Sequence, residues 1–389
     1  MVLISEFSGG PSGPVLRAWD AGCTGKDVAL PPAHANYLAS VRESAARLAG
    51  AGGESLVKVD AARAQGYADT LDVAKFDEYL ENVNGWARRL PLVFDSVAQE
   101  LNLIALVDLL QLGSGFRQEL HKATGRGASD TIKFGCISLH ISQTPVDARG
   151  MQALTLDEVS QNFGIPLLGE ERPVVKGSTA VMVSEAGPLR PLAEIILGCL
   201  HDTGVRLEQG GYSSLADFII RTCAEKPTAE HLVRKLVTAF PSLRDAADVD
   251  GHPVYLFKKA QLIAHDICQR FGDSDPKFAF PDIGDMTLFV DNVIPAVMQH
   301  HGLLVPCEEI AAKIQAGKEL ALVEATAMRA AAIVAAQLVV DRAGSAASPL
   351  EMARFPMCQA TLDSFWWREG KEPELRALPR LVCKKTAYY

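Results

Sequence analysis

The spacing of apolar residues predicts helices along most of the chain. Between Phe257 and Phe271, apolar residues recur at steps of three and four, which places them on one face of a helix. The run from Val97 to Leu112 is apolar on nearly every side, which predicts a helix buried on all its faces. The stretch from Leu320 to Val340 is rich in alanine and has high helix propensity.

Short joints of glycine and proline separate these helical stretches. Gly50 to Gly53 follow a helical pattern, as glycine at a helix C-terminus commonly does. Gly187 and Pro188 precede another such pattern, and Gly210 and Gly211 break the chain before the next. Helices that alternate with short joints predict an all-α architecture with few or no short strands.

Glycine and proline also mark the beginning of the chain. Residues 1–33 hold two Gly-Pro pairs, one Pro-Pro pair and little periodicity, which predicts an irregular N-terminal arm. Residues 34–389 are then expected to form a single helical domain.

The overall charge restricts the class of partner. The chain carries 38 lysines and arginines against 47 aspartates and glutamates, a formal net charge of −9. A surface of that sign repels polynucleotides and anionic membranes, so neither is expected as a partner. A small phosphorylated ligand remains compatible with it, because a few clustered cations suffice to bind one phosphate.

Cysteine usage and the apolar runs indicate a cellular location. The eight cysteines occur singly, and no Cys-x-x-Cys pair or Cys/His spacing typical of a zinc site is present, so no metal is expected. The N-terminus lacks the pattern of a secretory signal, and the runs inspected are too short or too polar to span a bilayer. We expect a soluble intracellular protein of the cytoplasm, with the nucleus left open.

Two aspartates lie in apolar surroundings and are candidates for chemistry. Asp108 lies in the middle of the apolar run, where an ionised carboxylate is costly unless it is paired. It is either a structural acid satisfied by amides or an arginine, or an acid that faces a ligand. Asp291 precedes Pro295 by four residues, and a helix continuing through Pro295 would leave the Asp291 carbonyl without a partner. Asp291 is either an N-cap or an acid satisfied within the core, or else a catalytic acid.

Several short blocks, taken together and in order, resemble the queuosine salvage family, the queuosine 5'-phosphate N-glycosylase/hydrolases. The resemblance extends from about Leu92 to the last residue. The matching residues are Asp108 with Leu110 and Leu112-Gly113-Ser114-Gly115-Phe116-Arg117, Phe240-Pro241-Ser242 with Arg244-Asp245, Phe257-Lys258-Lys259-Ala260-Gln261 with Asp266, then Thr287, Phe289, Asp291 and Pro295, Leu362-Asp363 with Phe365 and Trp367, and Tyr388-Tyr389.

The resemblance implies a fold and an activity. The fold would be a single helical domain related to base-excising DNA glycosylases. It would include a helix between Thr131 and Ser142, where β-branched residues by themselves favour a strand. The activity would be hydrolysis of the N-glycosidic bond of queuosine 5'-phosphate, which releases queuine for salvage into tRNA modification. The substrate would be this small nucleotide, and no metal or cofactor is needed.

The resemblance also suggests roles for individual residues. Asp291 is the expected catalytic acid, because an ionised carboxylate stabilises the positive charge that develops on the sugar. Tyr388 and Tyr389 are expected to dock into the body and border the site. The expected substrate-binding residues are Asp108, Gln111, Lys259, Phe289, Asn292, Asp363, Trp367 and Tyr389.

Some of these roles have alternatives in the sequence. Lys259 is compatible with a solvated surface lysine, a partner of Asp266, or a phosphate ligand. Phe365, Trp366 and Trp367 are aromatic residues of the kind that more often fill a core than stack on a base. Gln111 departs from the family pattern, in which asparagine is common, and its longer side chain shifts any contact by one methylene.

Two other classes of function remain open. A DNA base glycosylase is suggested by the implied fold but disfavoured by the charge of −9. A non-enzymatic helical binding scaffold is possible for any helix-rich chain, and it predicts no enclosed polar pocket. The enzyme hypothesis instead predicts that Asp108, Asp291 and Asp363 converge on one pocket.

Overall fold

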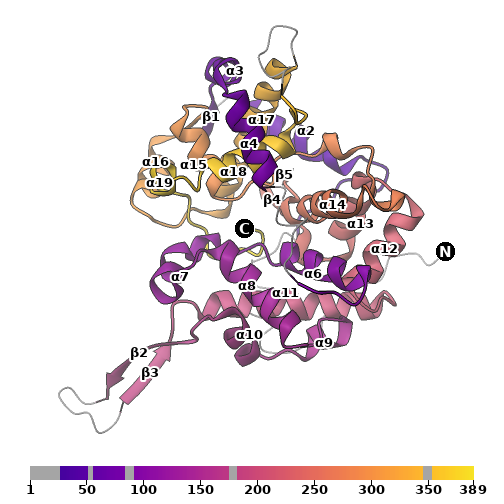
Figure 1. The fold of residues 1–389 in the computed structure, drawn as a ribbon. Helices are drawn as coiled ribbons and strands as arrows, with labels where there is room; N and C mark the ends of the chain where they lie inside the picture. Colours follow the sequence, from indigo (N-terminus) through magenta and orange to yellow (C-terminus); the bar gives the residue numbers. More distant parts are fainter. Residues whose placement is uncertain (1–26, 51–55, 84–91, 175–181, 345–352) are drawn as a thin grey trace.

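Helices dominate the structure, a computed structural model that describes residues 27–50, 56–83, 92–174, 182–344 and 353–389 (Figure 1). Among these residues, the β-structure consists of three two-stranded sheets and one isolated bridge. The prediction of a mainly helical fold is therefore confirmed. The relation to DNA glycosylases stays a prediction, as do the domain boundaries.

The elements follow one another with short connections. The first half of the chain forms α2 (Tyr37–Gly50), β1 (Val57–Val59), α3 (Ala61–Thr70), α4 (Val73–Val83), α6 (Val97–Leu109), η1 (Ser114–Phe116), α7 (Arg117–Thr124), α8 (Ala128–Ile141), α9 (Ala148–Ala153), α10 (Leu156–Phe163), β2 (Leu168–Pro173) and β3 (Met182–Ala186). The second half forms α11 (Arg190–Gln209), α12 (Leu215–Glu225), α13 (Ala229–Ala239), η2 (Pro241–Leu243), β4 (Ala246–Val249), β5 (His252–Tyr255), α14 (Lys258–Phe271), η3 (Pro276–Phe278), η4 (Ile283–Asp285), α15 (Val293–His300), β6 (Leu304–Pro306), α16 (Glu308–Gln315), α17 (Leu322–Ala343), α18 (Gln359–Glu369) and α19 (Pro373–Arg376).

The three sheets are all antiparallel pairs. β1 pairs with β6, which joins the beginning of the chain to the segment after α15. β4 and β5 form a tight hairpin that leads into α14. β2 and β3 form a second hairpin, which projects away from the helical body (Figure 1).

The helices predicted from apolar periodicity are present. α6 is buried on nearly all sides, as its sequence predicted, and Asp108 lies within it. The segment from Thr131 to Ser142 is helical, as the family resemblance implied, and lies almost wholly within α8. The predicted irregular arm falls mostly outside the described residues, since the description begins at Asp27.

α17 is the helix that most resembles a membrane span by length and composition among the described residues. Thirteen of its residues are buried inside the protein, and its middle carries Arg329, which forms an ion pair with Asp245. It contacts α2, α3, α15 and α18. These contacts are those of a core helix.

The segment around Pro295 corrects one premise of the sequence analysis. α15 begins at Val293, so it does not extend back through Asp291. Pro295 therefore lies in the first turn of the helix. A backbone N–H at that place has no acceptor within the helix, so its absence from proline breaks no helical hydrogen bond. The carbonyl of Asp291 is not left open by a proline within a continuing helix.

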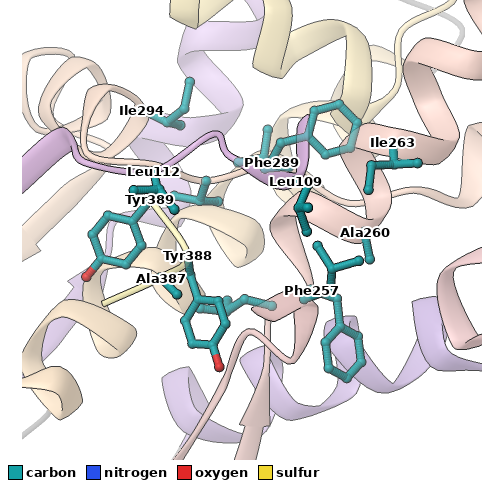
Figure 2. Close-up of a cluster of buried hydrophobic side chains, with 14 of the residues drawn as sticks. Leu109, Leu112, Phe257, Ala260, Ile263, Phe289, Ile294, Ala387, Tyr388 and Tyr389 are labelled. Atoms are coloured by element: carbon teal, nitrogen blue, oxygen red, sulfur yellow. The ribbon is translucent and has the colours of Figure 1, made fainter. Parts of the chain in front are cut away.

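The last residues of the chain lie in the interior, as expected for Tyr388 and Tyr389. Figure 2 shows Ala387, Tyr388 and Tyr389 among the apolar side chains contributed by α6, α14 and the loop before α15, and all three are buried. The main-chain N–H of Gly113 donates to the main-chain oxygen of Tyr389 at 3.1 Å. This docking brings the C-terminal segment to the centre of the molecule (Figure 1).

Gly115 provides a test of this docking. A Cβ atom there would lie 2.3 Å from the main-chain oxygen of Cys383, which is too close for any real contact. We expect Gly115→Ala to lower the thermal midpoint because the C-terminal segment must move. Gly66→Ala is the matched control, since Gly66 lies in α3 with nothing within 4 Å of the added atom. Alanine should stabilise that helix by roughly 0.5–1 kcal/mol. Equal midpoints for the two variants would contradict the docking.

Candidate active site

A cavity of about 310 Å³ lies between the starts of η1, α8, α14 and α15 and the chain that follows α18. Five of the residues named from the sequence line it, and four do not. The lining residues are Gln111, Asp291, Asn292, Trp367 and Tyr389. The sequence placed Asp108, Lys259, Phe289 and Asp363 in the site as well, but these four lie behind its wall.

Asp291 lies on the cavity wall immediately before α15. Its Oδ1 accepts a hydrogen bond from the N–H of Val293 at 2.6 Å, which holds the carboxylate at the beginning of the helix. Its neighbour Asn292 donates from Nδ2 to the Ser114 carbonyl at 3.3 Å and thereby ties this turn to η1. The position of the carboxylate is thus fixed by the two residues that follow it in the sequence.

The backbone that leads to Asp291 is held mainly by side chains. The N–H groups of Thr287, Leu288 and Phe289 donate in turn to Gln261 Oε1 at 2.9 Å, Gln359 Oε1 at 3.1 Å and Asp363 Oδ1 at 2.8 Å. These three acceptors come from α14 and α18. They take the place that a neighbouring strand would have in a sheet.

A buried ion pair completes this support. Arg329 forms two hydrogen bonds to the Asp245 carboxylate, at 2.9 and 2.6 Å, and both side chains are at most 3% exposed. The Nε of Arg329 donates to the carbonyl of Val290, the residue just before Asp291, at 2.9 Å. The guanidinium also lies 4.2 Å from the centre of the Tyr389 ring. One arginine therefore joins Asp245 to two segments that border the cavity, those of Asp291 and Tyr389.

The turn into α14 is strained. Phe257 has a φ of 49°, a left-handed conformation that is rare for a bulky residue. Its buried ring lies between those of Tyr37 and Tyr255, and its N–H donates to the carbonyl of Asp245 at 3.1 Å. These contacts hold the turn that places Lys258 at the beginning of α14.

The two lysines that open α14 have different environments. Lys258 lines the cavity, and its Nζ donates to the carbonyl of Gln111 at 3.0 Å. Lys259 is fully buried, and its Nζ donates to the carbonyl of Leu109 at the end of α6, at 2.7 Å. Burial lowers the pKa of Lys259 to about 8. In this structure, Lys258 is the cavity lysine and Lys259 caps a helix C-terminus.

Asp363 lies directly behind Asp291. Burial, and next the charge of Asp291, raise the pKa of its carboxyl to about 8, although its bond from the Phe289 N–H opposes the shift. The ring of Phe289 packs 5.3 Å from that of His265, so it forms part of the wall behind the cavity. Asp363 is therefore mostly protonated at neutral pH and positions the loop before Asp291.

Asp108 is also buried. Burial and the nearby charge of Asp266 raise the pKa of its carboxyl well above the ordinary range. Among the described residues, its Oδ2 has no hydrogen-bond partner. A buried polar atom left in this way is unusual and is often found at a functional site. Within the described part of the chain, no amide or arginine satisfies this oxygen, as the structural alternative for Asp108 would require.

The cavity contains a cluster of cations that sequence reasoning missed. Counting side chains, six lysines and arginines line it against two aspartates, a formal charge of +4. Within the described part of the chain, none of the arginines among them has a carboxylate within ion-pair distance. The cations are Arg117, Lys258, Arg368, Lys371, Arg376 and Arg380.

Two of these cations, Lys371 and Arg380, are shielded from solvent. Burial lowers the pKa of Lys371 to about 8 and that of Arg380 to about 10. Arg380 donates from Nη2 to the carbonyl of Gly370 at 2.8 Å. Lys371 lies 4.2 Å from the centre of the Trp367 ring, a cation–π contact on the cavity wall. The one sequence signal for this cluster was the recurrence of basic residues in the stretch after Trp367.

The described residues contain no group of three or more histidine, cysteine, aspartate or glutamate side chains arranged to hold a metal.

The pH dependence of stability tests the environment of Asp363. Because its pKa is higher in the folded protein than in the unfolded chain, folding favours its protonated form. Its contribution to the free energy of unfolding should fall as pH rises from about 4 to about 8. Asp363→Asn keeps the acceptor for Phe289 and removes the titration, so its stability should decline less over this interval. Chemical denaturation at pH 5, 7 and 8.5 measures this. Parallel curves for the two proteins would refute the assignment.

Comparisons with known proteins identify the family of the chain. A family model described as "Queuosine salvage protein" matches residues 174–389, more than half of the chain. The chain is 31% identical over 162 residues to the queuosine 5'-phosphate N-glycosylase/hydrolase of Sphaerobacter thermophilus, a match that covers 41% of each chain. The protein of the same name from Mus musculus is 30% identical over 159 residues, which cover 39% of this chain and 42% of the relative.

A longer match joins the chain to the queuosine 5'-phosphate N-glycosylase/hydrolase of Nematostella vectensis. It is 27% identical over 214 residues and covers 52% of this chain and 60% of the relative. The matches thus span between two fifths and three fifths of these relatives. Asp291, Trp367 and the four cations that follow Trp367 (Arg368, Lys371, Arg376 and Arg380) lie within the region of the family model, and the chain belongs to the queuosine salvage protein family.

Proposed function

We propose that this protein hydrolyses the N-glycosidic bond of queuosine 5'-phosphate and releases queuine, which can then enter tRNA modification. The names of the relatives support this, although the matches cover only part of their lengths. The observation that carries the proposal is one carboxylate, Asp291, fixed on the wall of a cavity that is otherwise strongly cationic.

The chemistry requires a negative charge beside the anomeric carbon. As the base departs with the bonding electrons, positive charge develops on the sugar, and the Asp291 carboxylate stabilises it by its field or by forming a bond. Water then supplies the hydroxyl group to the sugar, and its proton balances the charge on the leaving base. The products are queuine and ribose 5-phosphate.

The cation cluster supplies the site for the 5'-phosphate. Arg117, Arg376 and Arg380 present guanidinium groups, which bind phosphate oxygens in pairs. Lys371 adds a point charge between them and Trp367. Because the phosphate is remote from the bond that breaks, its binding energy serves to hold the sugar against Asp291.

The base is a 7-deazaguanine, whose carbon at position 7 cannot accept a proton as nitrogen would. Its departure must therefore be assisted at its other polar edges. Trp367 offers a face for stacking, and Gln111, Asn292 and Tyr389 line the same cavity. Asp108 and Asp363 are buried acids with raised pKa values behind this wall and are proposed to act on the base edges or its cationic side chain.

Two of the residues expected to bind substrate are proposed to act indirectly. Lys259 fixes the end of α6, and Phe289 fixes the wall below Asp291. Both are positioning residues in this proposal.

The other classes of function fit the site less well. A DNA glycosylase needs an extended basic surface, whereas here the cations lie within one cavity of a chain whose net charge is −9. A binding scaffold does not require a carboxylate fixed on the wall of a cationic cavity. The proposal places the enzyme inside the cell, where its nucleotide substrate is produced.

Asp291→Asn tests the catalytic role. The change keeps the shape and the acceptor for Val293 but removes the charge, so base release should fall by about a hundredfold or more. The thermal midpoint and ligand affinity should change little. Single-turnover rate and midpoint are measured on the same preparation. Near-normal turnover in a folded variant would mean that another acid is the catalytic one.

A second test concerns the phosphate. Specificity constants for queuosine 5'-phosphate should exceed those for queuosine, and equal values would reject the phosphate site. The preference should shrink above pH 8, because Lys371 loses its proton there and with it the charge that attracts phosphate. Lys371→Arg should retain the preference at pH 9, since arginine stays protonated. The pH profile of kcat/KM for both substrates measures this.

A further inference from the structure

A second cavity adjoins the first. It has a volume of about 320 Å³ and lies between η1, the beginning of α7, the end of α16 and the segment from Ala377 to Val382. Four residues, Ser114, Arg117, Asn292 and Arg380, line both cavities. The wall between the two therefore includes two of the cations that the proposed function assigns to the 5'-phosphate.

The charge of the first cavity exceeds what one phosphate needs. Its side chains carry a formal charge of +4, and a phosphate monoester brings about −2 near neutral pH. Arg368, Arg376 and Asp130 are exposed, and the other charged side chains of the lining carry a formal charge of +3. A monophosphate therefore leaves about one positive charge without a partner in the less exposed part of the cavity, which is costly. This balance favours a ligand that carries more negative charge than a monophosphate.

Two polar atoms on the shared wall point to the same conclusion. The Nε of Arg380 and the Oγ of Ser114 are buried and have no hydrogen-bond partner among the described residues. Arg380 as a whole is only 9% exposed. Both groups are able to donate a hydrogen bond, which suits them to an anion at the boundary of the two cavities.

The other charged side chains of the second cavity add no net positive charge to that of the shared wall. Lys384 pairs with Glu119 at 2.5 Å, so these two charges cancel. The end of α16 is capped, because the N–H groups of Ala316 and Gly317 donate to carbonyls of the last turn. The surplus of positive charge therefore lies on the shared wall.

We infer that the enzyme also accepts nucleoside 5'-diphosphates, with the first phosphoryl group at the cations of the first cavity and the second at Arg117 and Arg380 on the side of the second cavity. This inference rests on the proposed function, and the chemistry at the sugar is the same: water cleaves the N-glycosidic bond. The diphosphate leaves intact on the ribose.

Ala316 provides a test outside the proposed catalytic machinery. It is exposed, lines only the second of the two cavities and follows the last residue of α16. Ala316→Glu places a negative charge in that cavity, and Ala316→Gln adds the same bulk without charge. Release of base from queuosine 5'-phosphate and from queuosine 5'-diphosphate is measured with each protein.

For the unmodified protein we expect kcat/KM values for the two substrates within about tenfold of each other. Ala316→Glu should lower the value for the diphosphate by about tenfold, because a like charge repels the second phosphoryl group. It should leave the monophosphate within about twofold, and Ala316→Gln should leave both substrates within about twofold. These are small free-energy differences, since tenfold corresponds to about 1.4 kcal/mol.

Other outcomes separate the inference from the proposed function. Turnover of the monophosphate with no binding or turnover of the diphosphate would overturn the inference alone. So would a diphosphate activity that Ala316→Glu leaves unchanged or lowers equally for both substrates. Failure to release base from either substrate would overturn the proposed function.

Discussion

The ion pair between Asp245 and Arg329 is the interaction on which the candidate site depends. Both side chains are almost completely buried, so either charge alone would be costly and the pair forms only when both segments are in place. Asp245 also accepts the N–H of Lys258, and Arg329 also binds the carbonyl of Val290. The site is therefore assembled by contacts between segments that are far apart in the sequence.

This dependence explains how a loop can carry a fixed carboxylate. Residues Thr287 to Val290 have no neighbouring strand, and their backbone groups bond instead to side chains of α14, α17 and α18. Each helix is anchored in the core, so the loop takes its position from three rigid elements. A catalytic group held within a fraction of an ångström requires support of this kind.

The sequence could predict the helices because their apolar periodicity is local. It also indicated Asp291, Trp367 and the docked Tyr389, and these line one cavity. It could not separate Lys258 from Lys259, because adjacent residues on a helix differ only in direction and the carbonyl groups that distinguish them lie about 150 residues earlier. The cations after Trp367 lie partly in irregular chain, where no periodicity reveals which way a side chain points.

The three acids in and behind the wall of the cavity have different surroundings. Asp363 and Asp108 are buried, and next to burial the largest contribution to each raised pKa is the charge of another aspartate. Asp291 instead lies on a wall with Lys258, Lys371 and Arg380, and its charge raises the pKa of each of these cations against the effect of burial. The fold thus keeps Asp291 among cations, while burial favours the protonated forms of the two acids behind it. Surroundings that differ in burial and charge are a general way in which a fold gives different roles to carboxyl groups at one site.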